Sequence, residues 1–260
     1  MGCPVGVGPE ILLRFFVTPG AMNGAAVVVG DAGVLRRVAA HLGIDVTVEV
    51  WQPGQDVPVG VVPVLSLSDL AETDCSWGQP NQLTGRAMGR YIEETVRLVR
   101  EGVLSGMVTC PIAKSALNAA GYNYPGHTEM LAELTATDDF AMMLAGERLR
   151  VTLVTIHCAL EKVVGLLSVE AVERLIRITG RALRDDFGIK TPRIAVAGLN
   201  PHAGEGGMFG DEEARCIAPA IKKAESEGWQ VEGPFPPDTV FFKAANGDLT
   251  QWSACIMTRD

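Results

Sequence analysis

The alternation of short apolar runs with amphipathic stretches constrains the fold of this chain more than any other feature. Ala25–Val29 is a β-prone run that ends at a Gly-Asp pair. Ala32–Leu42 then has apolar residues at helical spacing, and Val46–Val50 is again strand-like. A strand, a helix and a second strand in this order form a βαβ unit, which requires a parallel sheet covered by helices. The sequence therefore predicts an α/β fold.

The same rhythm continues to the end of the chain. Helices are expected at Asn81–Glu101, Lys114–Ala120, Thr128–Leu134, Ser168–Phe187, Asp211–Glu227 and Asp238–Ala245. Strands are expected at Gly60–Leu67, Gly106–Thr109, Phe140–Ala145, Val151–Ile156, Arg193–Ala197 and Ser253–Met257. The two runs on either side of Gly146 are spaced like a hairpin. We therefore predict a mixed, largely parallel sheet or two α/β subdomains.

Composition and charge exclude several classes of protein. The length of 260 residues fits one large domain or two closely packed ones. The net charge is −9 and no basic stripe occurs, so nucleic acid is not an expected partner. No apolar run approaches the ~20 residues of a membrane-spanning helix. Six cysteines occur without C-x-x-C spacing, which favours reduced thiols and a cytoplasmic location.

Two histidines follow predicted strands and are candidate metal ligands. His157 comes after Val151–Ile156, and His202 comes shortly after Arg193–Ala197. Ligands of open α/β sheets lie beyond the carboxyl ends of the strands. Two imidazoles and a third group can hold a divalent metal ion with positions left open for a substrate. Spacing alone is equally consistent with two separate loop histidines, each satisfied by a hydrogen bond.

Other loop residues leave a similar choice open. Gly204–Gly207 offers backbone N–H groups that could hold an anion, although a surface turn explains this stretch equally well. Lys114 could bind a phosphate or a carboxylate. Asp238 is most simply a helix N-cap, which is compatible with a place in an active site. Cys110 has no general base that the sequence can assign to it, so a thiol nucleophile is a weak hypothesis.

Six motifs, spread over almost the whole chain, resemble the PdxA family. They occur in family order as Met1-Gly2-Cys3-Pro4 through Gly8-Pro9-Glu10, Thr109-Cys110-Pro111-Ile112-Ala113-Lys114, Gly126-His127-Thr128-Glu129, Thr155-Ile156-His157, Asn200–Gly207 and Pro237-Asp238-Thr239. The Asn-Pro-His-Ala-Gly-Glu and Gly-His-Thr-Glu stretches are the most specific. The chain is identified by these motifs as a member of that family.

The resemblance implies a fold similar to that of isocitrate and isopropylmalate dehydrogenases. Residues 1–260 would form a single unit made of two interleaved α/β subdomains. The resemblance further implies a homodimer whose active site lies in the cleft at the shared interface.

The resemblance also assigns roles to individual residues. His157 and His202 match two metal-binding histidines of the family. His127 and Thr128 match its substrate-binding pair, with Lys114 as a further group for the anionic substrate. Asp238 matches an acidic residue near the reacting group, whereas no residue is assigned to NAD.

The implied activity is the oxidation and decarboxylation of 4-phosphohydroxy-L-threonine in pyridoxal phosphate biosynthesis. It would use NAD or NADP and a divalent metal ion such as Zn, Mg, Co or Mn. One alternative is the same chemistry on D-erythronate 4-phosphate or D-threonate 4-phosphate, or on an aromatic cis-dihydrodiol.

Departures from the family pattern add a second alternative. Cys3 and Cys110 stand where the family has Asp and Gly, and Met1 falls inside a motif that a short strand normally precedes. Arg259 or Asp260 occupies the place of a third metal-binding histidine. Arg stays protonated and cannot be a ligand, whereas Asp can. The family's later substrate-binding residues would fall beyond Asp260. We therefore expect a chain truncated at both ends, and a catalytically inactive homologue is the second alternative.

Overall fold

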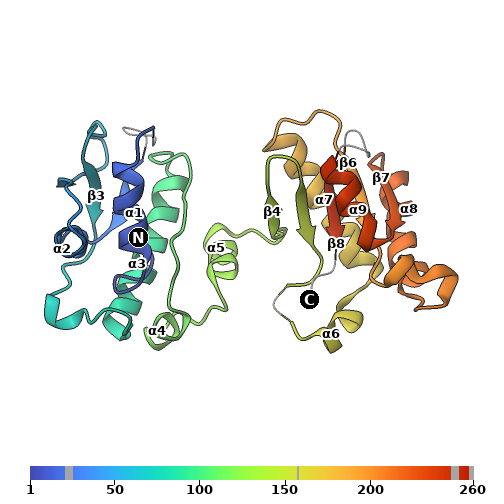
Figure 1. Ribbon diagram of the computed structural model, residues 1–260, viewed down its shortest axis with the longest axis horizontal. Coiled ribbons are helices and arrows are strands. Elements are labelled where there is room, and N and C mark those ends of the chain that lie inside the picture. Colours follow the sequence, from blue (N-terminus) through green and yellow to red (C-terminus); the bar gives the residue numbers. More distant parts are fainter. Residues whose placement is uncertain (21–25, 157, 247–251, 258–260) are drawn as a thin grey trace. The chain divides into compact units, whose positions relative to one another are not determined.

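The chain forms two compact units, Met1–Thr137 and Asp138–Asp260. The computed structural model describes residues 1–20, 26–156, 158–246 and 252–257, drawn as a ribbon in Figure 1. Each unit has its own sheet and its own apolar core. The parallel strands confirm the predicted α/β class. Among the described residues, no helix is long and apolar enough to cross a membrane.

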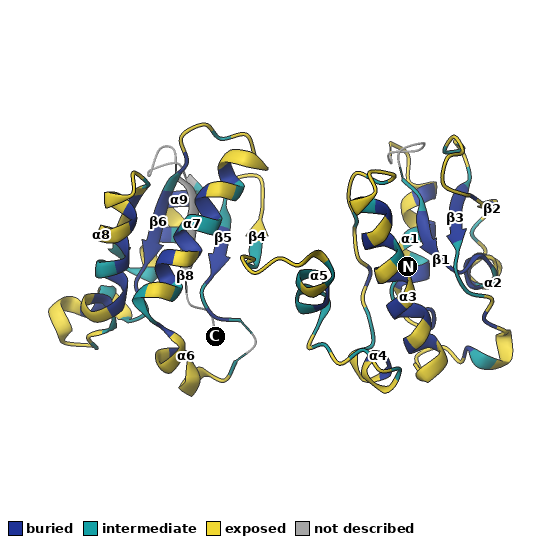
Figure 2. Ribbon diagram, turned by 180° about the vertical axis from the view of Figure 1, so that it is seen from behind, coloured by how far each residue is buried: buried dark blue, intermediate teal, exposed yellow. Residues whose placement is uncertain are grey.

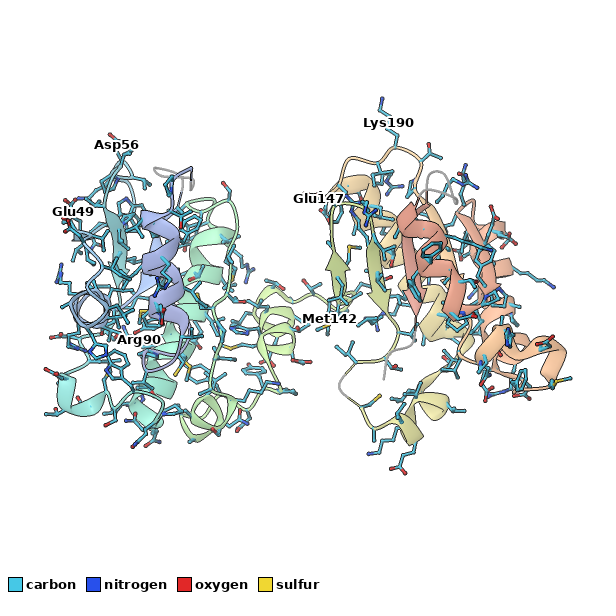
Figure 3. All side chains as sticks on the ribbon, in the orientation of Figure 1. Glu49, Asp56, Arg90, Met142, Glu147 and Lys190 are labelled. Carbon is cyan, nitrogen blue, oxygen red and sulfur yellow. The ribbon has the colours of Figure 1, made fainter. Side chains whose placement is uncertain are left out.

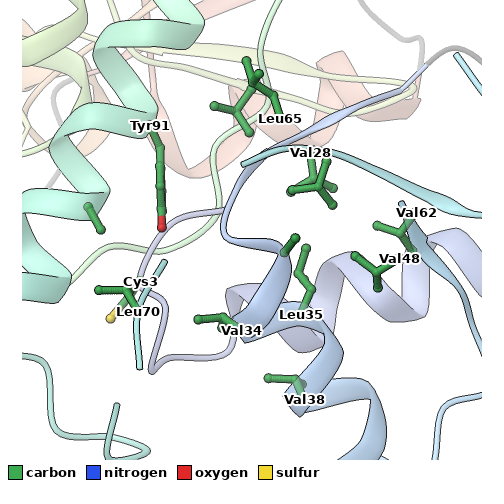
Figure 4. Close-up of a cluster of buried hydrophobic side chains, with 14 of the residues drawn as sticks. Cys3, Val28, Val34, Leu35, Val38, Val48, Val62, Leu65, Leu70 and Tyr91 are labelled. Atoms are coloured by element: carbon green, nitrogen blue, oxygen red, sulfur yellow. The ribbon is translucent and has the colours of Figure 1, made fainter. Parts of the chain in front are cut away.

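The first unit is built on a three-stranded parallel sheet with the order β1-β3-β2. Its strands are β1 (Val28–Gly30), β2 (Val48–Val50) and β3 (Val62–Ser66). Its helices are α1 (Gly8–Val17), α2 (Ala32–Leu42), α3 (Gln82–Arg100), α4 (Lys114–Ala119) and α5 (His127–Thr135), with a short 3-10 turn, η1 (Glu72–Asp74). The central strand β3 is buried from Val62 to Leu65 because helices cover both faces. Figure 4 shows Val48 and Val62 of neighbouring strands in one cluster with Leu35 of α2.

Helix α2 begins and ends where its sequence predicts. Asp31 is the N-cap, and its carboxylate accepts a hydrogen bond from Val34 N at 2.9 Å. The other carboxylate oxygen accepts from Ser68 Oγ at 2.7 Å and from Leu70 N at 2.9 Å. Gly43 ends the helix in the left-handed conformation, with φ 63°. Asp31 is fully buried, so these three donors satisfy it and join α2 to the segment that follows β3.

Gly85 permits the close approach of α3 and α4. A Cβ at this position would lie 2.0 Å from the backbone oxygen of Ala116. We expect Gly85→Ala to force the two helices apart and lower the unfolding free energy by roughly 1–3 kcal/mol, measured by thermal denaturation. Gly165→Ala is the control, since nothing surrounds a Cβ there and alanine favours a helix. Equal stability of the two variants would contradict this prediction.

The second unit contains a five-stranded mixed sheet with the order β4-β5-β8-β6-β7. Its strands are β4 (Met143–Ala145), β5 (Arg150–Leu153), β6 (Arg193–Ala197), β7 (Gln230–Phe235) and β8 (Trp252–Met257). Its helices are α6 (Leu160–Leu166), α7 (Val169–Asp185), α8 (Ala218–Ser226) and α9 (Pro237–Asn246), with the turns η2 (Pro201–Gly207) and η3 (Glu213–Ile217). Strands β4 and β5 form the predicted antiparallel hairpin, and the other pairs are parallel.

Strand β6 is the buried centre of this unit. Ile194 and Val196 pack into a core with residues of α7 and α8, whereas Ala195 and Ala197 pack with residues of α9. Successive side chains of a strand point to opposite faces, so helices cover both faces of β6. Figure 2 shows the buried colour on the strand and on the helix sides that face it. The loops beyond the strand ends are therefore the part of this sheet that can meet a ligand.

Several predicted elements are corrected by the structure. Gly106–Thr109 is not a strand, because no described strand pairs with this segment. Val108 in this segment is 98% exposed. The predicted helix Asp211–Glu227 begins with the π-helical turn η3 and only then continues as α8. Strand β5 ends at Leu153 rather than at Ile156. The predicted interleaving of the two subdomains stays a prediction.

Two helices and one strand escaped the sequence analysis. Glycines and prolines around α1 hide its helical pattern, and α6 has only 7 residues. Strand β7 contains Gly233-Pro234, a pair that signals a turn rather than a strand.

Candidate functional site

Four strands of the second sheet share one carboxyl edge. Strands β5, β8, β6 and β7 run in the same direction because each neighbouring pair is parallel. The turn η2, which carries His202, follows β6, and α9, which carries Asp238, follows β7. The turn also contacts both β7 and α9. The structure thus brings the His202 loop and the Asp238 helix together at this edge.

The backbone around His202 is held in an unusual left-handed turn. His202, Ala203 and Glu205 have φ values of 54°, 54° and 42°. Positive φ is uncommon for residues other than glycine, so three of them in one turn require support from their surroundings. The imidazole of His202 is exposed, and its ring centre lies 6.1 Å from that of Phe209. The turn therefore presents this imidazole at the surface.

Glu213 supplies that support. Its side chain is only 5% exposed, and it accepts a hydrogen bond from Asn200 N at 2.7 Å and another from Asn200 Nδ2 at 3.0 Å. The Asn200 amide also donates to Glu212 Oε2 at 2.7 Å, and this bond holds the pKa of Glu212 below its usual range. A Cβ at Gly204 would lie 2.7 Å from Glu213 Oε2, so the backbone of the turn packs directly against this carboxylate. The sequence analysis missed Glu213, although two adjacent carboxylates after a glycine-rich loop were visible.

Asp238 lies inside α9 rather than at its N-cap, which corrects the prediction. The helix begins at Pro237, so Asp238 belongs to the first turn. A carboxylate there interacts favourably with the helix dipole. Its side chain is exposed at the same sheet edge as His202, where a bound molecule can reach it.

Lys114, His127 and Thr128 lie together in the first unit. Lys114 begins α4 and His127 begins α5, and Lys114 Nζ lies 3.9 Å from where a Cβ on Gly126 would stand. Within the described parts of the chain, no hydrogen bond or ion pair engages these three side chains. Gly126 provides no side-chain cap for α5, so N–H groups of its first turn remain available. A cation, an imidazole, a hydroxyl and these N–H groups can together bind an anion.

The environment of His127 affects its protonation. Burial first, then the Met1 α-amino group and the Lys114 ammonium, lower the pKa of His127 below its ordinary value. Each of these effects disfavours the charged imidazolium. His127 is therefore neutral at pH 7 and donates through a single ring N–H.

The thiols in the opening motif and the Cys-Pro loop are not activated. Burial raises the pKa of Cys3 and of Cys110, so both thiols stay protonated at neutral pH. A protonated thiol is a poor nucleophile, which agrees with the weak support that the sequence gives to Cys110 as a nucleophile. Among the described residues, Cys3, Cys75, Cys110, Cys158 and Cys216 have free thiols.

A complete metal site is not contained in the described ranges. His157, Arg259 and Asp260 lie outside the described residues, and those that are described contain no group of three His, Cys, Asp or Glu able to hold a metal ion. Strand β5 nevertheless runs in the same direction as β6, with β8 between them. The segment that leads from β5 to position 157 therefore starts at the edge where His202 lies.

Known proteins are similar to this chain over nearly its whole length. The family described as pyridoxal phosphate biosynthetic protein PdxA matches residues 23–256. The chain belongs to the PdxA family. A 4-hydroxythreonine-4-phosphate dehydrogenase from Desulfosudis oleivorans is 48% identical, in a match that covers 96% of this chain and 75% of that protein. A D-threonate 4-phosphate dehydrogenase from Salmonella typhimurium is 40% identical over 251 residues, covering 95% of this chain and 76% of that protein.

A solved PdxA-family structure has the same fold. The crystal structure of a 4-hydroxythreonine-4-phosphate dehydrogenase from Klebsiella pneumoniae matches with a TM-score of 0.91 and 36% identity. The match covers 99% of this chain and 79% of that one. The predicted family and the α/β fold with parallel sheets are thereby confirmed.

Proposed function

We propose that this PdxA-family chain is an NAD-dependent, divalent-metal-dependent dehydrogenase that oxidises and decarboxylates 4-phosphohydroxy-L-threonine. The observation that carries the proposal is the 48% identity, over 96% of the chain, to a relative named for that substrate. We also propose the isocitrate dehydrogenase-like arrangement and a homodimer with a shared active site. Either NAD or NADP would accept the hydride, and no contact to it is assigned.

The residues at the carboxyl edge of the second sheet suit a divalent cation. An exposed imidazole at His202 and an exposed carboxylate at Asp238 are the nitrogen and oxygen donors that Zn, Mg, Co or Mn accept. We propose His157 and His202 as two ligands, with Arg259 or Asp260 at the place of a third. When bound, the ion supplies Lewis-acid chemistry to alcohol oxidation and decarboxylation.

The remaining polar residues would bind and orient the substrate. Lys114, His127 and Thr128 offer donors to its phosphate or carboxylate group, and no described residue engages them in a hydrogen bond or ion pair. Asp238 would stand near the reacting carbon, where its carboxylate can accept a proton.

Binding of an anion should take up a proton at His127. The pKa of free His127 is lowered, and a bound phosphate dianion raises it by favouring the imidazolium. Affinity therefore increases as the pH falls from 7, until the free imidazole itself becomes protonated. Nuclear magnetic resonance titration of the ring, with and without inorganic phosphate, measures both pKa values.

Lys114→Ala should raise the pKa of free His127 slightly, since it removes the smallest of the three causes. Lys190→Ala is the matched control, because Figure 3 shows Lys190 at the outer end of a loop in the other unit. An unchanged His127 titration upon phosphate binding would remove His127 from the anion site.

A direct assay tests the proposed activity. NADH formation is measured with 4-phosphohydroxy-L-threonine, D-erythronate 4-phosphate, D-threonate 4-phosphate and an aromatic cis-dihydrodiol. The relative named for D-threonate 4-phosphate, at 40% identity, makes that substrate the second candidate. We expect the highest kcat/KM with the first substrate. No turnover of any substrate, together with no stoichiometric metal uptake, would identify an inactive homologue.

A further inference from the structure

The aromatic ring of Phe209 lies beside the imidazole of His202, shortly after the η2 turn. The two ring centres are 6.1 Å apart, and the ring planes make an angle of 41°. Aromatic pairs that attract each other typically have their centres about 4.5–7 Å apart. The side chain of Phe209 is 47% exposed, so it is not part of a core. Its contact with His202 therefore calls for an explanation other than the packing of the unit.

The backbone holds Phe209 in this place. Its N–H donates a hydrogen bond to Gly204 O at 3.2 Å, within the left-handed turn that also carries His202. The next residue, Gly210, has a φ of 141°, and a Cβ there would lie 2.5 Å from Asn200 Nδ2. Only glycine fits that position, so the chain packs onto Asn200 directly after Phe209. One backbone arrangement thus carries both rings and fixes their relative positions.

His202 lacks the polar partner that usually orients a metal-binding histidine. Such a histidine almost always donates its second ring N–H to a carboxylate, a backbone carbonyl or a water molecule, which fixes the orientation of the ring. In the part of the chain that the structure describes, no protein hydrogen bond or ion pair engages the imidazole of His202. An exposed side chain without such a bond changes between rotamers. The packing against Phe209 restricts this rotation instead.

We propose that Phe209 is a positioning residue, whose ring holds the imidazole of His202 in the orientation that binds the divalent metal ion. The inference rests on the proposed function, because it takes His202 as a ligand. An imidazole that is already oriented loses less conformational entropy when the ion binds, so the affinity for the ion rises. Phe209 has no donor atom for a metal ion and acts only through His202.

The neighbouring residue Met208 provides a matched control. Met208 directly precedes Phe209 in the same segment and is also apolar, but it is 75% exposed and has no aromatic ring. Met208→Ala therefore removes a similar amount of apolar side chain from the segment without removing the contact with His202. Phe209→Tyr is the conservative variant, because it keeps the ring.

Calorimetric titration of each protein with Zn or Mn measures the effect on metal binding. Phe209→Ala should lower the affinity for the ion about tenfold or more, because the imidazole is then free to rotate. Phe209→Tyr and Met208→Ala should bind the ion as tightly as the wild-type protein. Metal uptake that Phe209→Ala leaves unchanged would refute this inference alone. Absence of uptake by the wild-type protein would refute the proposed function and the inference with it.

Nuclear magnetic resonance tests the orientation of His202 in the metal-free protein at a fixed pH. The ring current of Phe209 shifts the Cδ2 and Cε1 proton signals of His202, which the His202→Ala protein identifies among the signals of the four histidines. In Phe209→Ala these signals should move toward the values of an unstructured histidine. In Phe209→Tyr and Met208→Ala they should stay shifted. Identical signals in Phe209→Ala and the wild-type protein would overturn the inference, because the ring would then not hold the imidazole.

Discussion

His202→Ala is expected to abolish stoichiometric uptake of Zn, Mn or Co and to lower kcat/KM by a factor of ~10³ or more. The imidazole is exposed at the carboxyl edge of the second sheet, and no described hydrogen bond or ion pair engages it. Its removal therefore breaks no described hydrogen bond and deletes one of the two proposed nitrogen ligands. Metal binding is measured by calorimetric titration, and activity by NADH formation.

The control for this variant is His41→Ala. His41 is an exposed residue in the last turn of α2, far from any candidate ligand in the sequence. The His41→Ala substitution should leave metal uptake and turnover unchanged. Stoichiometric metal binding by the His202→Ala protein, with wild-type affinity, would show that the metal ion is held elsewhere. Loss of stability in that variant would point instead to a structural role for the ring.

The sequence predicted best where local patterns decide the structure. The strand Arg193–Ala197 was predicted with its observed bounds, because a short β-prone run ends there in a glycine. The loop with His202 then follows at the strand end. Ser168 is the predicted N-cap of α7, and its hydroxyl accepts from Ala171 N at 3.1 Å. Such signals lie within a few residues of one another, so one sequence is enough to read them.

The failures concern interactions between distant segments. Gly106–Thr109 has the composition of a buried strand, but a strand also requires a neighbour to pair with. Glu213 supports the His202 turn through bonds to Asn200, 13 positions away. The spacing of apolar residues along the sequence does not predict a hydrogen bond between two polar residues in a loop and a helix. Lys114 was predicted to begin a helix and His127 to precede one, whereas α4 and α5 begin at these two residues, and their proximity depends on the packing of the unit.

Glu213→Gln is expected to destabilise the second unit and to weaken metal binding together. Both oxygens of Glu213 accept hydrogen bonds from Asn200, at 2.7 and 3.0 Å. A glutamine must direct its amide NH₂ toward one of these donors, which leaves a buried donor unsatisfied. This costs about 1–3 kcal/mol of unfolding free energy. The left-handed turn also loses the carboxylate that holds Asn200 in place. Metal affinity should therefore fall by roughly 10–100-fold, which is typical when a residue that orients a metal ligand is replaced.

The matched control is Glu212→Gln, one position earlier. Glu212 accepts one bond from the Asn200 amide through Oε2 and others from the backbone N–H groups of Asp211 and Glu212, and a glutamine oxygen can still accept the bond from Asn200. We therefore expect a change in metal affinity of less than about threefold in this variant. Both variants lose one negative charge. A difference between their metal affinities therefore reports the hydrogen bonds of Glu213 to Asn200 and not the loss of charge. If Glu213→Gln bound metal as tightly as Glu212→Gln, the turn would hold His202 without the carboxylate.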